Sequence, residues 1–190
     1  MPWGLSTRLW HCDCTIEQQK QPMPQFHFLY HLEDNGIFPN SRLPAILYRH
    51  ALELPNLFKA AYVKKLFARH GWTNAWDAGI FTYSHYHSIT HEVLGFYKGS
   101  TNILLGGDNG RQLRVEAGDV LIIPAGVAHR NLDQEQNVAC IGAYPGGSDY
   151  DINIGKPGER PGTDQRIAAV PIPSEDPVYG IEKGLVKIWG

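Results

Sequence analysis

The sequence predicts an all-β fold, a sandwich or barrel of short strands, and three observations lead to this prediction. After Gly79, short apolar stretches recur at regular spacing, with turns rich in glycine and proline between them. Two motifs of histidine, glutamate and glycine lie within these stretches. Charged residues make up only 19% of the 190 residues, while glycine and proline number 20 and 13, which is typical of a turn-rich globular protein. We expect a flexible leader over 1–24 and a single domain over 25–190.

The chain before Gly79 contributes extended structure and one helix. Extended structure is expected from Phe26, and a turn follows at 34–36, where the sequence reads DNG. Pro39 and Pro44 bracket a piece that we expect to be irregular, ahead of an apolar stretch at 46–48. Between Pro55 and Gly71 the apolar residues recur at near-helical spacing, which predicts a helix packed on the body of the domain; they are Leu57, Phe58, Ala61, Leu66 and Phe67.

Seven strands are expected after Gly79, over 80–87, 92–98, 102–105, 112–115, 120–123, 129–132 and 138–144. The strand at 120–123 reads VLII and is apolar on both faces, so its outer face needs a cover. The helix, the C-terminal segment or a second subunit could supply this cover, and a homodimer is therefore expected.

The segment after Pro145 is rich in glycine and proline, and we expect it to be irregular and to run over the surface. Extended pieces are predicted at 167–170 and 185–189. Four apolar residues of this segment could dock onto the body or onto a second subunit: Tyr179, Ile181, Val186 and Trp189.

Four residues of the two motifs are candidate metal ligands. The first motif reads Gly79-x5-His85-x-His87-x4-Glu92-x6-Gly99, and the second reads Gly118-x5-Pro124-x-Gly126-x2-His129. Side chains alternate along a strand, so His85 and His87 share a face, and a turn lets Glu92 open the next strand beside them. His129 follows the second turn and can close the site. Three imidazoles and one carboxylate suit one divalent ion of Fe, Mn, Ni, Cu or Zn.

The same alternation predicts the walls of the site. Phe81 and Tyr83 share the face of the two histidines, and Leu94 and Phe96 share the inward face of Glu92, so all four are expected inside the barrel. Tyr83 could hydrogen-bond a substrate or be an ordinary core tyrosine.

A plain structural role is the alternative for each ligand, because a lone histidine on a strand is usually a core or surface residue. The joint pattern favours the metal, since an unpaired carboxylate in an apolar interior is costly and a bound cation removes that cost. His91 neighbours Glu92 and should point to the other face, so a surface or supporting role is favoured over a ligand role.

Both motifs resemble those of the cupin superfamily over about 79–144. The first matches at every fixed position. The second matches its glycines, proline and histidine, and departs at its end, where the family pattern has Asn and this chain has Asp133, with Asn131 nearby. Over roughly 27–190, the stretches DNGIFPNSRLPAILYR, HYHSITHEVLGFYKG, GAYPGG and KPGERP resemble a group of small bacterial cupins of uncharacterised function, the YjlB-like group. The resemblance implies a cupin-type double-stranded β-helix, that is, a jelly-roll barrel, and a bound metal.

The expected site indicates a small-molecule function. Three neutral imidazoles and one carboxylate around a divalent ion leave a net charge of +1 and two open positions on an octahedral ion. A metal-dependent enzyme on a small molecule is expected, most simply an oxygenase, with a sugar isomerase or epimerase next. The alternatives are a non-catalytic cupin that binds a small molecule or a metal, and a metal-free structural barrel.

Composition argues against several other classes. The net charge is −2 and no basic run is present, so nucleic acid is not an expected partner. No apolar stretch reaches membrane-spanning length, and the N-terminus lacks a signal peptide's apolar region, so a cytoplasmic location is expected. An odd count of three cysteines argues against a disulfide scaffold. Cys12 and Cys14, beside His11, are expected in a loose terminal segment, and Cys140 is expected as a small buried hydrophobe.

Overall fold

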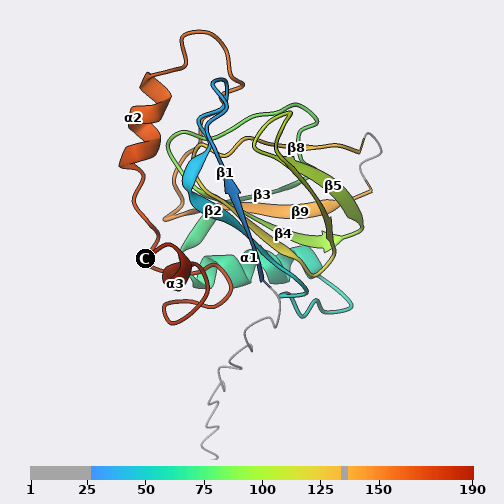
Figure 1. The fold of residues 1–190 in the computed structure, drawn as a ribbon. Coiled ribbons are helices and arrows are strands. Elements are labelled where there is room, and N and C mark those ends of the chain that lie inside the picture. Colours follow the sequence, from blue (N-terminus) through green and yellow to red (C-terminus); the bar gives the residue numbers. More distant parts are fainter. Residues whose placement is uncertain (1–26, 134–136) are drawn as a thin grey trace, which may run out of the picture.

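The structure is a computed structural model that describes residues 27–133 and 137–190. Strands dominate this part of the chain, and three helices accompany them (Figure 1). In order, the elements are β1 (His27–Leu32), β2 (Ser41–Tyr48), α1 (Lys59–Arg69), β3 (Trp72–Ala78), β4 (Glu92–Lys98), β5 (Ser100–Leu105), β6 (Arg111–Glu116), β7 (Val120–Ile123), β8 (His129–Asn131), β9 (Ala139–Pro145), α2 (Gly162–Ala169) and α3 (Leu185–Ile188).

The strands form two sheets, and every strand pair in them is antiparallel. The larger sheet has the order β1-β2-β7-β4-β9-β3, and the smaller has the order β6-β5-β8. Their inner faces meet in one apolar core, in which Leu94 and Leu121 of the larger sheet join Ile103 and Leu105 of the smaller one. The prediction of an all-β fold is confirmed, and the two antiparallel sheets form a sandwich around this core.

A second core lies on the outer face of the larger sheet. Along β7 the side chains alternate, so Leu121 and Ile123 face the inner core while Val120 and Ile122 face outward. Phe67 of α1 and Trp189 near the C-terminus belong to the same buried cluster as the outward pair. The helix and the C-terminal segment therefore supply the cover that this strand was predicted to need. The homodimer stays a prediction, and this face does not require it.

Two glycines of the motifs are explained by the backbone. Gly99 and Gly126 have φ angles of +67° and +90°, which side chains with a Cβ rarely adopt. A Cβ on Gly99 would lie 1.7 Å from the Asn137 carbonyl oxygen, and one on Gly126 would lie 2.3 Å from that of Asn40. The motif glycines thus mark tight turns against neighbouring backbone.

The predicted boundaries are correct at some elements and wrong at others. Strands β4 and β7 have the predicted bounds, while α1 begins at Lys59, later than expected, and ends before Gly71. Strand β3 was not predicted. The piece before 46–48 is not irregular, because β2 includes Pro44, which lies at the irregularity in the β1–β2 pairing where a missing N–H is tolerated.

The strand predicted over 80–87 is the main error in the predicted secondary structure. This segment makes isolated bridges, His85 with His129 and Tyr86 with Asn153, in place of a continuous ladder. After β9, the pieces predicted as extended are largely helical, in α2 and α3. Hydrophobic alternation alone does not distinguish such short segments from strands.

The remaining predictions concern the termini and the cysteines. The leader at 1–24, with His11, Cys12 and Cys14, lies outside the described residues. Cys140 is fully buried in the inner core, as predicted. Among the described helices, none is long and apolar enough to cross a lipid bilayer.

Candidate metal centre

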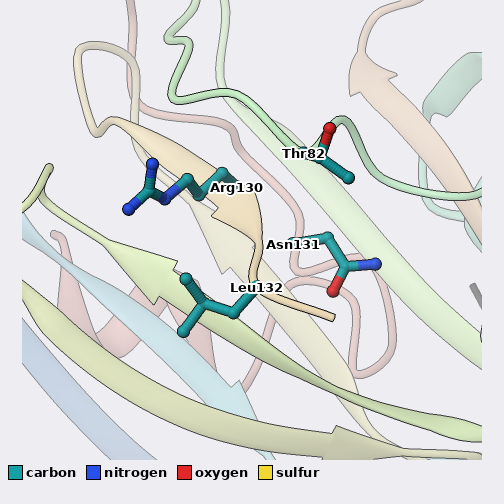
Figure 2. A pocket seen from close by; sticks show the side chains of 4 residues that line it. All are labelled: Thr82, Arg130, Asn131 and Leu132. Carbon is teal, nitrogen blue, oxygen red and sulfur yellow. The ribbon is translucent and has the colours of Figure 1, made fainter. Parts of the chain in front are cut away.

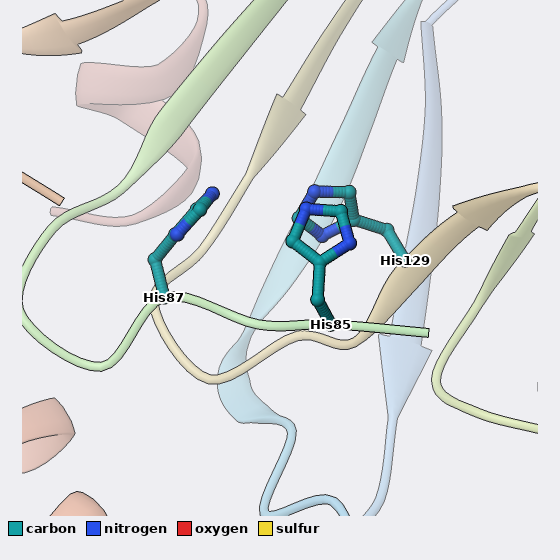
Figure 3. Close-up of side chains that lie close together, drawn as sticks. All are labelled: His85, His87 and His129. Atoms are coloured by element: carbon teal, nitrogen blue, oxygen red, sulfur yellow. The ribbon is translucent and has the colours of Figure 1, made fainter. Parts of the chain in front are cut away.

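The four predicted ligands lie together at one end of the inner core. Glu92 opens β4, His129 opens β8, and His85 and His87 lie on the segment that leads into β4. One ligand atom from each imidazole lies within 4.8 Å of the others, and Figure 3 shows the three rings grouped together. Glu92 Oε2 lies 3.2 Å from His129 Nε2 and 3.4 Å from His87 Nε2. All four side chains are 2–4% exposed.

Backbone pairing fixes the segment that carries two of the histidines. His85 N donates to the His129 carbonyl at 3.2 Å, and His129 N donates to the His85 carbonyl at 2.9 Å. On the following residue, Tyr86 exchanges bonds of 2.9 and 3.0 Å with Asn153 of the C-terminal segment. The ligand segment is thus held between β8 and the C-terminal segment.

A backbone carbonyl fixes the orientation of each imidazole. The Nδ1 atoms of His85, His87 and His129 lie 3.3, 2.5 and 3.1 Å from the carbonyl oxygens of Tyr83, Asp151 and Val127. A carbonyl can only accept, so Nδ1 carries a proton in each ring, and a neutral ring then keeps its lone pair on Nε2. This pattern is the usual outer support of a metal-binding histidine.

Glu92 is oriented by a chain of two aromatic side chains. Its Oε1 accepts a bond of 3.0 Å from the Tyr144 hydroxyl, which in turn accepts one of 2.8 Å from Trp76 Nε1. The Trp76 ring packs directly on Gly142, where a Cβ would lie 2.1 Å from Trp76 Cε2. With Oε1 engaged, Oε2 faces the imidazoles.

The electrostatics favour an ionised Glu92 carboxylate and a neutral His85 imidazole. Burial lowers the pKa of His85 to about 3, and the neighbouring His129 and His87 act in the same direction. Burial also acts to lower the pKa of His87, but the Glu92 carboxylate outweighs it and the pKa is raised. For Glu92, burial acts to raise the pKa, and the adjacent His87 and His129 outweigh it, so the pKa lies below its usual range.

The C-terminal segment contributes a polar network behind His87. The Asp151 carboxylate accepts bonds from Ser88 N at 2.6 Å and from Ser88 Oγ at 2.5 Å, and from Asn153 Nδ2 at 2.8 Å. Arg166 of α2 donates to Ser88 Oγ at 2.8 Å. Asp151 therefore holds the ligand segment through its side chain and orients His87 through its carbonyl.

The donor set and its spacing fit a divalent transition metal. Two ligands about 2.1 Å from one ion and at right angles to each other lie about 3 Å apart. The separations of 3.2 and 3.4 Å between Glu92 Oε2 and the two Nε2 atoms are close to this value. An ion held here would satisfy a buried carboxylate and three converging lone pairs at once.

Some side chains near the ligands do not follow the predictions. Phe81 and Tyr83 are 46% and 45% exposed, so they are not buried inside the barrel, because their segment is not a regular strand. Their rings stack on each other at 4.9 Å and contact the His85 ring at 5.1 and 5.6 Å. Leu94 and Phe96 are buried in the inner core, as predicted.

His91 is neither at the surface nor among the grouped imidazoles. It is 2% exposed, and its Nδ1 accepts a bond of 3.0 Å from Ala125 N in the turn that precedes His129. Its ring lies 4.9 Å from that of Trp189. The surface interpretation is wrong, and the geometry agrees with a supporting role.

Sequence reasoning missed Tyr144, Trp76 and Asp151. Tyr144 had a signal, since it follows Cys140 and Gly142 at alternate positions of a predicted strand whose neighbours carry the site. No sequence signal marked Asp151, because it orients His87 through its backbone carbonyl and every residue has a backbone carbonyl. Asp133, where the family pattern has Asn, closes the turn after β8 by accepting a bond from Asn102 N at 3.0 Å.

Comparisons with known proteins give one relative in sequence and several in structure. The chain is 38% identical over 161 residues to the uncharacterised protein YjlB of Bacillus subtilis (strain 168), which covers 84% of this chain and 94% of that protein. No family model matches. An acireductone dioxygenase from Bacillus anthracis with a cadmium ion in its active center is 16% identical over 48% of this chain and 61% of its own, with a TM-score of 0.36. An oxalate decarboxylase is 20% identical over 42% of this chain and 22% of its own, with a TM-score of 0.33. The chain thus spans less than two thirds of either solved chain.

Proposed function

This chain belongs to the family of the uncharacterised YjlB protein, and from its candidate site we propose that it is a metal-dependent cupin enzyme acting on a small molecule. The name of that relative states no activity. The ligands proposed are His85, His87, Glu92 and His129. One observation carries the proposal: each of the four is already held by a hydrogen bond from outside the group. The second donor atoms of the three histidines lie within 4.8 Å of one another, and that of Glu92 lies beside His87 and His129. Such preorganisation is typical of a metal site and unnecessary in a plain core.

The number of ligands supports catalysis over a purely structural ion. Four protein donors leave two positions of an octahedral ion for substrate or O₂, whereas structural sites are closed by protein ligands. A divalent ion there would supply Lewis-acid or redox chemistry. Since three neutral imidazoles and one carboxylate leave a net charge of +1, the site favours an anionic or chelating substrate.

The exposed aromatic side chains around the candidate site favour an oxygenase over a sugar isomerase or epimerase. Phe81 and Tyr83 flank His85, while Tyr150 contacts the His87 ring at 5.3 Å and stacks on Tyr144 at 4.9 Å. Phe81, Tyr83 and Tyr150 are 45–46% exposed, so they offer apolar ring faces to an incoming molecule. A sugar would need a dense set of hydrogen-bonding groups, whereas these faces suit a planar, mostly apolar substrate.

Elemental analysis of protein purified without a His-tag tests the metal site. We expect about one divalent transition-metal ion per chain, and loss of most of it in His85→Ala and in His129→Ala, because each removes a converging lone pair. The matched control is His31→Ala, which removes an exposed histidine of β1 and should keep the wild-type metal content. Unchanged metal content in both site variants would show that the ligands are wrong.

A panel of small molecules tests catalysis separately. Oxygen consumption by the metal-loaded protein with planar chelating compounds is the expected result. Binding without any turnover, in both oxygen-dependent and isomerisation assays, would favour a non-catalytic cupin that binds a small molecule.

A further inference from the structure

The hollow beside β8 does not bring its polar groups together. It has a volume of about 520 Å³ and is lined by Thr82, Arg130, Asn131 and Leu132. Figure 2 shows the Arg130 guanidinium on one side of β8 and the Asn131 amide on the other. Asn131 is only 1% exposed, so its amide is not offered to a molecule in the hollow. The solvent side of α1 differs, because its side chains are exposed and alike in charge.

Two large apolar side chains at the start of α1 are exposed. Their helical spacing predicted that Leu57 and Phe58 pack on the body of the domain, but they are 72% and 83% exposed. The helix begins only at Lys59, so the helical spacing does not apply to them. Single exposed apolar residues are common, whereas two large neighbours form an apolar patch that favours a partner.

The backbone at Phe58 is strained. Its φ and ψ are +57° and +34°, in the left-handed region that residues other than glycine, asparagine and aspartate rarely adopt. The Phe58 carbonyl accepts a bond of 3.0 Å from Tyr62 N, so this conformation starts the helix. A glycine or asparagine would start the helix at lower cost. A large side chain that is both strained and left in solvent does not stabilise the fold, and such strain is typical of binding regions.

The solvent side of α1 carries positive charge alone. Lys65 and Arg69 lie four residues apart on one side of the helix, between the small exposed side chains of Ala61 and Ala68. We call these four residues, with Leu57 and Phe58 at their start, the exposed face of α1. The sequence from 55 to 71 contains no aspartate or glutamate and four cations, which are Lys59, Lys64, Lys65 and Arg69.

Few acids balance these charges. Lys64 Nζ lies 3.9 Å from Asp77 Oδ2 of β3. Among the residues that the structure describes, Lys59, Lys65 and Arg69 form no ion pair. The chain as a whole has a net charge of −2, so this face is locally opposite in sign to the molecule and attracts anions.

A lipid surface fits this face better than a protein does. A stable protein interface buries about 800 Å² on each partner and is depleted in lysine, whereas the large apolar side chains here are only Leu57 and Phe58. Contacts with a bilayer surface combine a few inserted Phe or Leu side chains with Lys and Arg against anionic headgroups. The aliphatic stems of Lys65 and Arg69 can lie along the bilayer while their charged ends reach the phosphates.

We propose that the exposed face of α1 docks the protein reversibly on an anionic lipid surface. Leu57 and Phe58 enter the boundary between headgroups and acyl chains, and Lys65 and Arg69 contact the lipid phosphates. The inference goes beyond the proposed function and does not rest on it, since α1 contributes no candidate metal ligand. Such docking needs no helix that crosses the bilayer.

Co-sedimentation with vesicles tests the apolar pair. The full chain should sediment with vesicles of equal parts phosphatidylglycerol and phosphatidylcholine. Leu57→Ser/Phe58→Ser should lower the partition coefficient by at least about tenfold, because two apolar side chains no longer leave water. The control is Ile37→Ser, whose side chain is 59% exposed in the turn between β1 and β2, at the opposite end of the molecule from α1 (Figure 1). Wild-type binding by the double variant would overturn the proposal.

The same assay tests the charges. Lys65→Gln/Arg69→Gln should weaken binding by at least about tenfold, since each cation near an anionic leaflet adds to the attraction. Arg111→Gln/Arg114→Gln makes the same charge change on β6 of the smaller sheet and should bind nearly as the wild type does. Vesicles of phosphatidylcholine alone should bind little protein, and equal binding to both kinds of vesicle would contradict the proposal.

A tryptophan at the start of α1 reports insertion directly. In Phe58→Trp, anionic vesicles should shift the emission to shorter wavelength and brominated lipid should quench it, because the indole enters the acyl region. Ile37→Trp should show neither change and corrects for the five native tryptophans. An unshifted Phe58→Trp spectrum would reject insertion. If the wild type ignores vesicles while Leu57→Ser/Phe58→Ser dissociates a dimer, the face is an interface between two copies and the lipid proposal fails.

Discussion

At the scale of single residues, the candidate ligands depend on contacts made outside the two motifs. Glu92 is oriented by Tyr144 and Trp76, and His87 by the Asp151 carbonyl. These supports restrict each ligand to one rotamer or tautomer before an ion arrives. They should therefore affect metal affinity without contributing a ligand atom.

Removal of one hydroxyl tests this dependence. In Tyr144→Phe, Glu92 Oε1 loses its 3.0 Å bond, and we expect the affinity for the metal to fall by about 10–100-fold while the fold is retained. Competition with a chelating dye measures the affinity. Tyr97→Phe is the control, since its hydroxyl bonds to Asp77 on the exposed side of the same strand, β4. A Tyr144→Phe affinity equal to that of the control would show that Glu92 needs no such support.

The grouping of the four candidate ligands could be predicted because residue type and spacing both carry the signal. An imidazole or a carboxylate at a defined interval is rare enough to be noticed in one sequence. Their supports could not all be predicted, since a backbone carbonyl such as that of Asp151 has no residue type.

At the scale of elements, packing of α1 on the larger sheet is the main contact outside the barrel. Phe67 is fully buried and lies over β4, where Gly95 leaves it room: a Cβ there would be 2.7 Å from Phe67 Cζ. The helix buries Val63, Leu66 and Phe67 against the sheet, and Phe67 is the largest of the three.

Truncation of Phe67 measures this contact. Phe67→Ala should lower the free energy of unfolding by about 3–5 kcal/mol, because it opens a cavity between α1 and the sheet. Denaturant unfolding gives the value. Phe58→Ala provides the control: Phe58 is 83% exposed, and its substitution should change stability by no more than about 0.5 kcal/mol. Similar losses in both variants would contradict the packing described.

Strand prediction succeeded where ladders are continuous and failed where they are not. Strands β4 and β7 pair with neighbours along their length, so alternate side chains of each strand point into the inner and the outer core, as the sequence pattern predicts. The segment 80–87 has only isolated bridges, so alternation misplaced Phe81 and Tyr83 although it grouped the two histidines correctly. The backbone path of this segment is determined by its contacts with β8 and the C-terminal segment.

At the scale of the whole molecule, the C-terminal segment closes the core on the outer face of the larger sheet. Asp176 is fully buried and accepts four bonds, from the Tyr48 hydroxyl of β2 and from the backbone N–H groups of Val178, Tyr179 and Leu185. Trp189 Nε1 donates to the Pro44 carbonyl at 2.9 Å. The last residues of the described chain are thus tied to its first strands.

Replacement of one Asp176 carboxylate oxygen by an amide nitrogen tests this connection between the C-terminal segment and the first strands. In Asp176→Asn the amide NH₂ cannot accept, so one backbone N–H is left without a partner, and we expect a loss of about 1–3 kcal/mol in unfolding free energy. Asp149→Asn, at an exposed position of the same segment, is the control and should be nearly neutral. Thermal or denaturant unfolding decides, and equal stability of the two variants would refute the role given to Asp176.

The bond from His87 to the Asp151 carbonyl also sets an order of events during biosynthesis. A chain is made from its N-terminus, so all four candidate ligands exist before residue 151 has been added. An ion that meets the nascent chain finds His85 and His129 with their orienting carbonyls already made, while His87 is still free to rotate. Assembly of the proposed centre would therefore end with the arrival of the C-terminal segment, and a ribosome stalled before that point would carry a chain whose His87 ring lacks the Asp151 carbonyl.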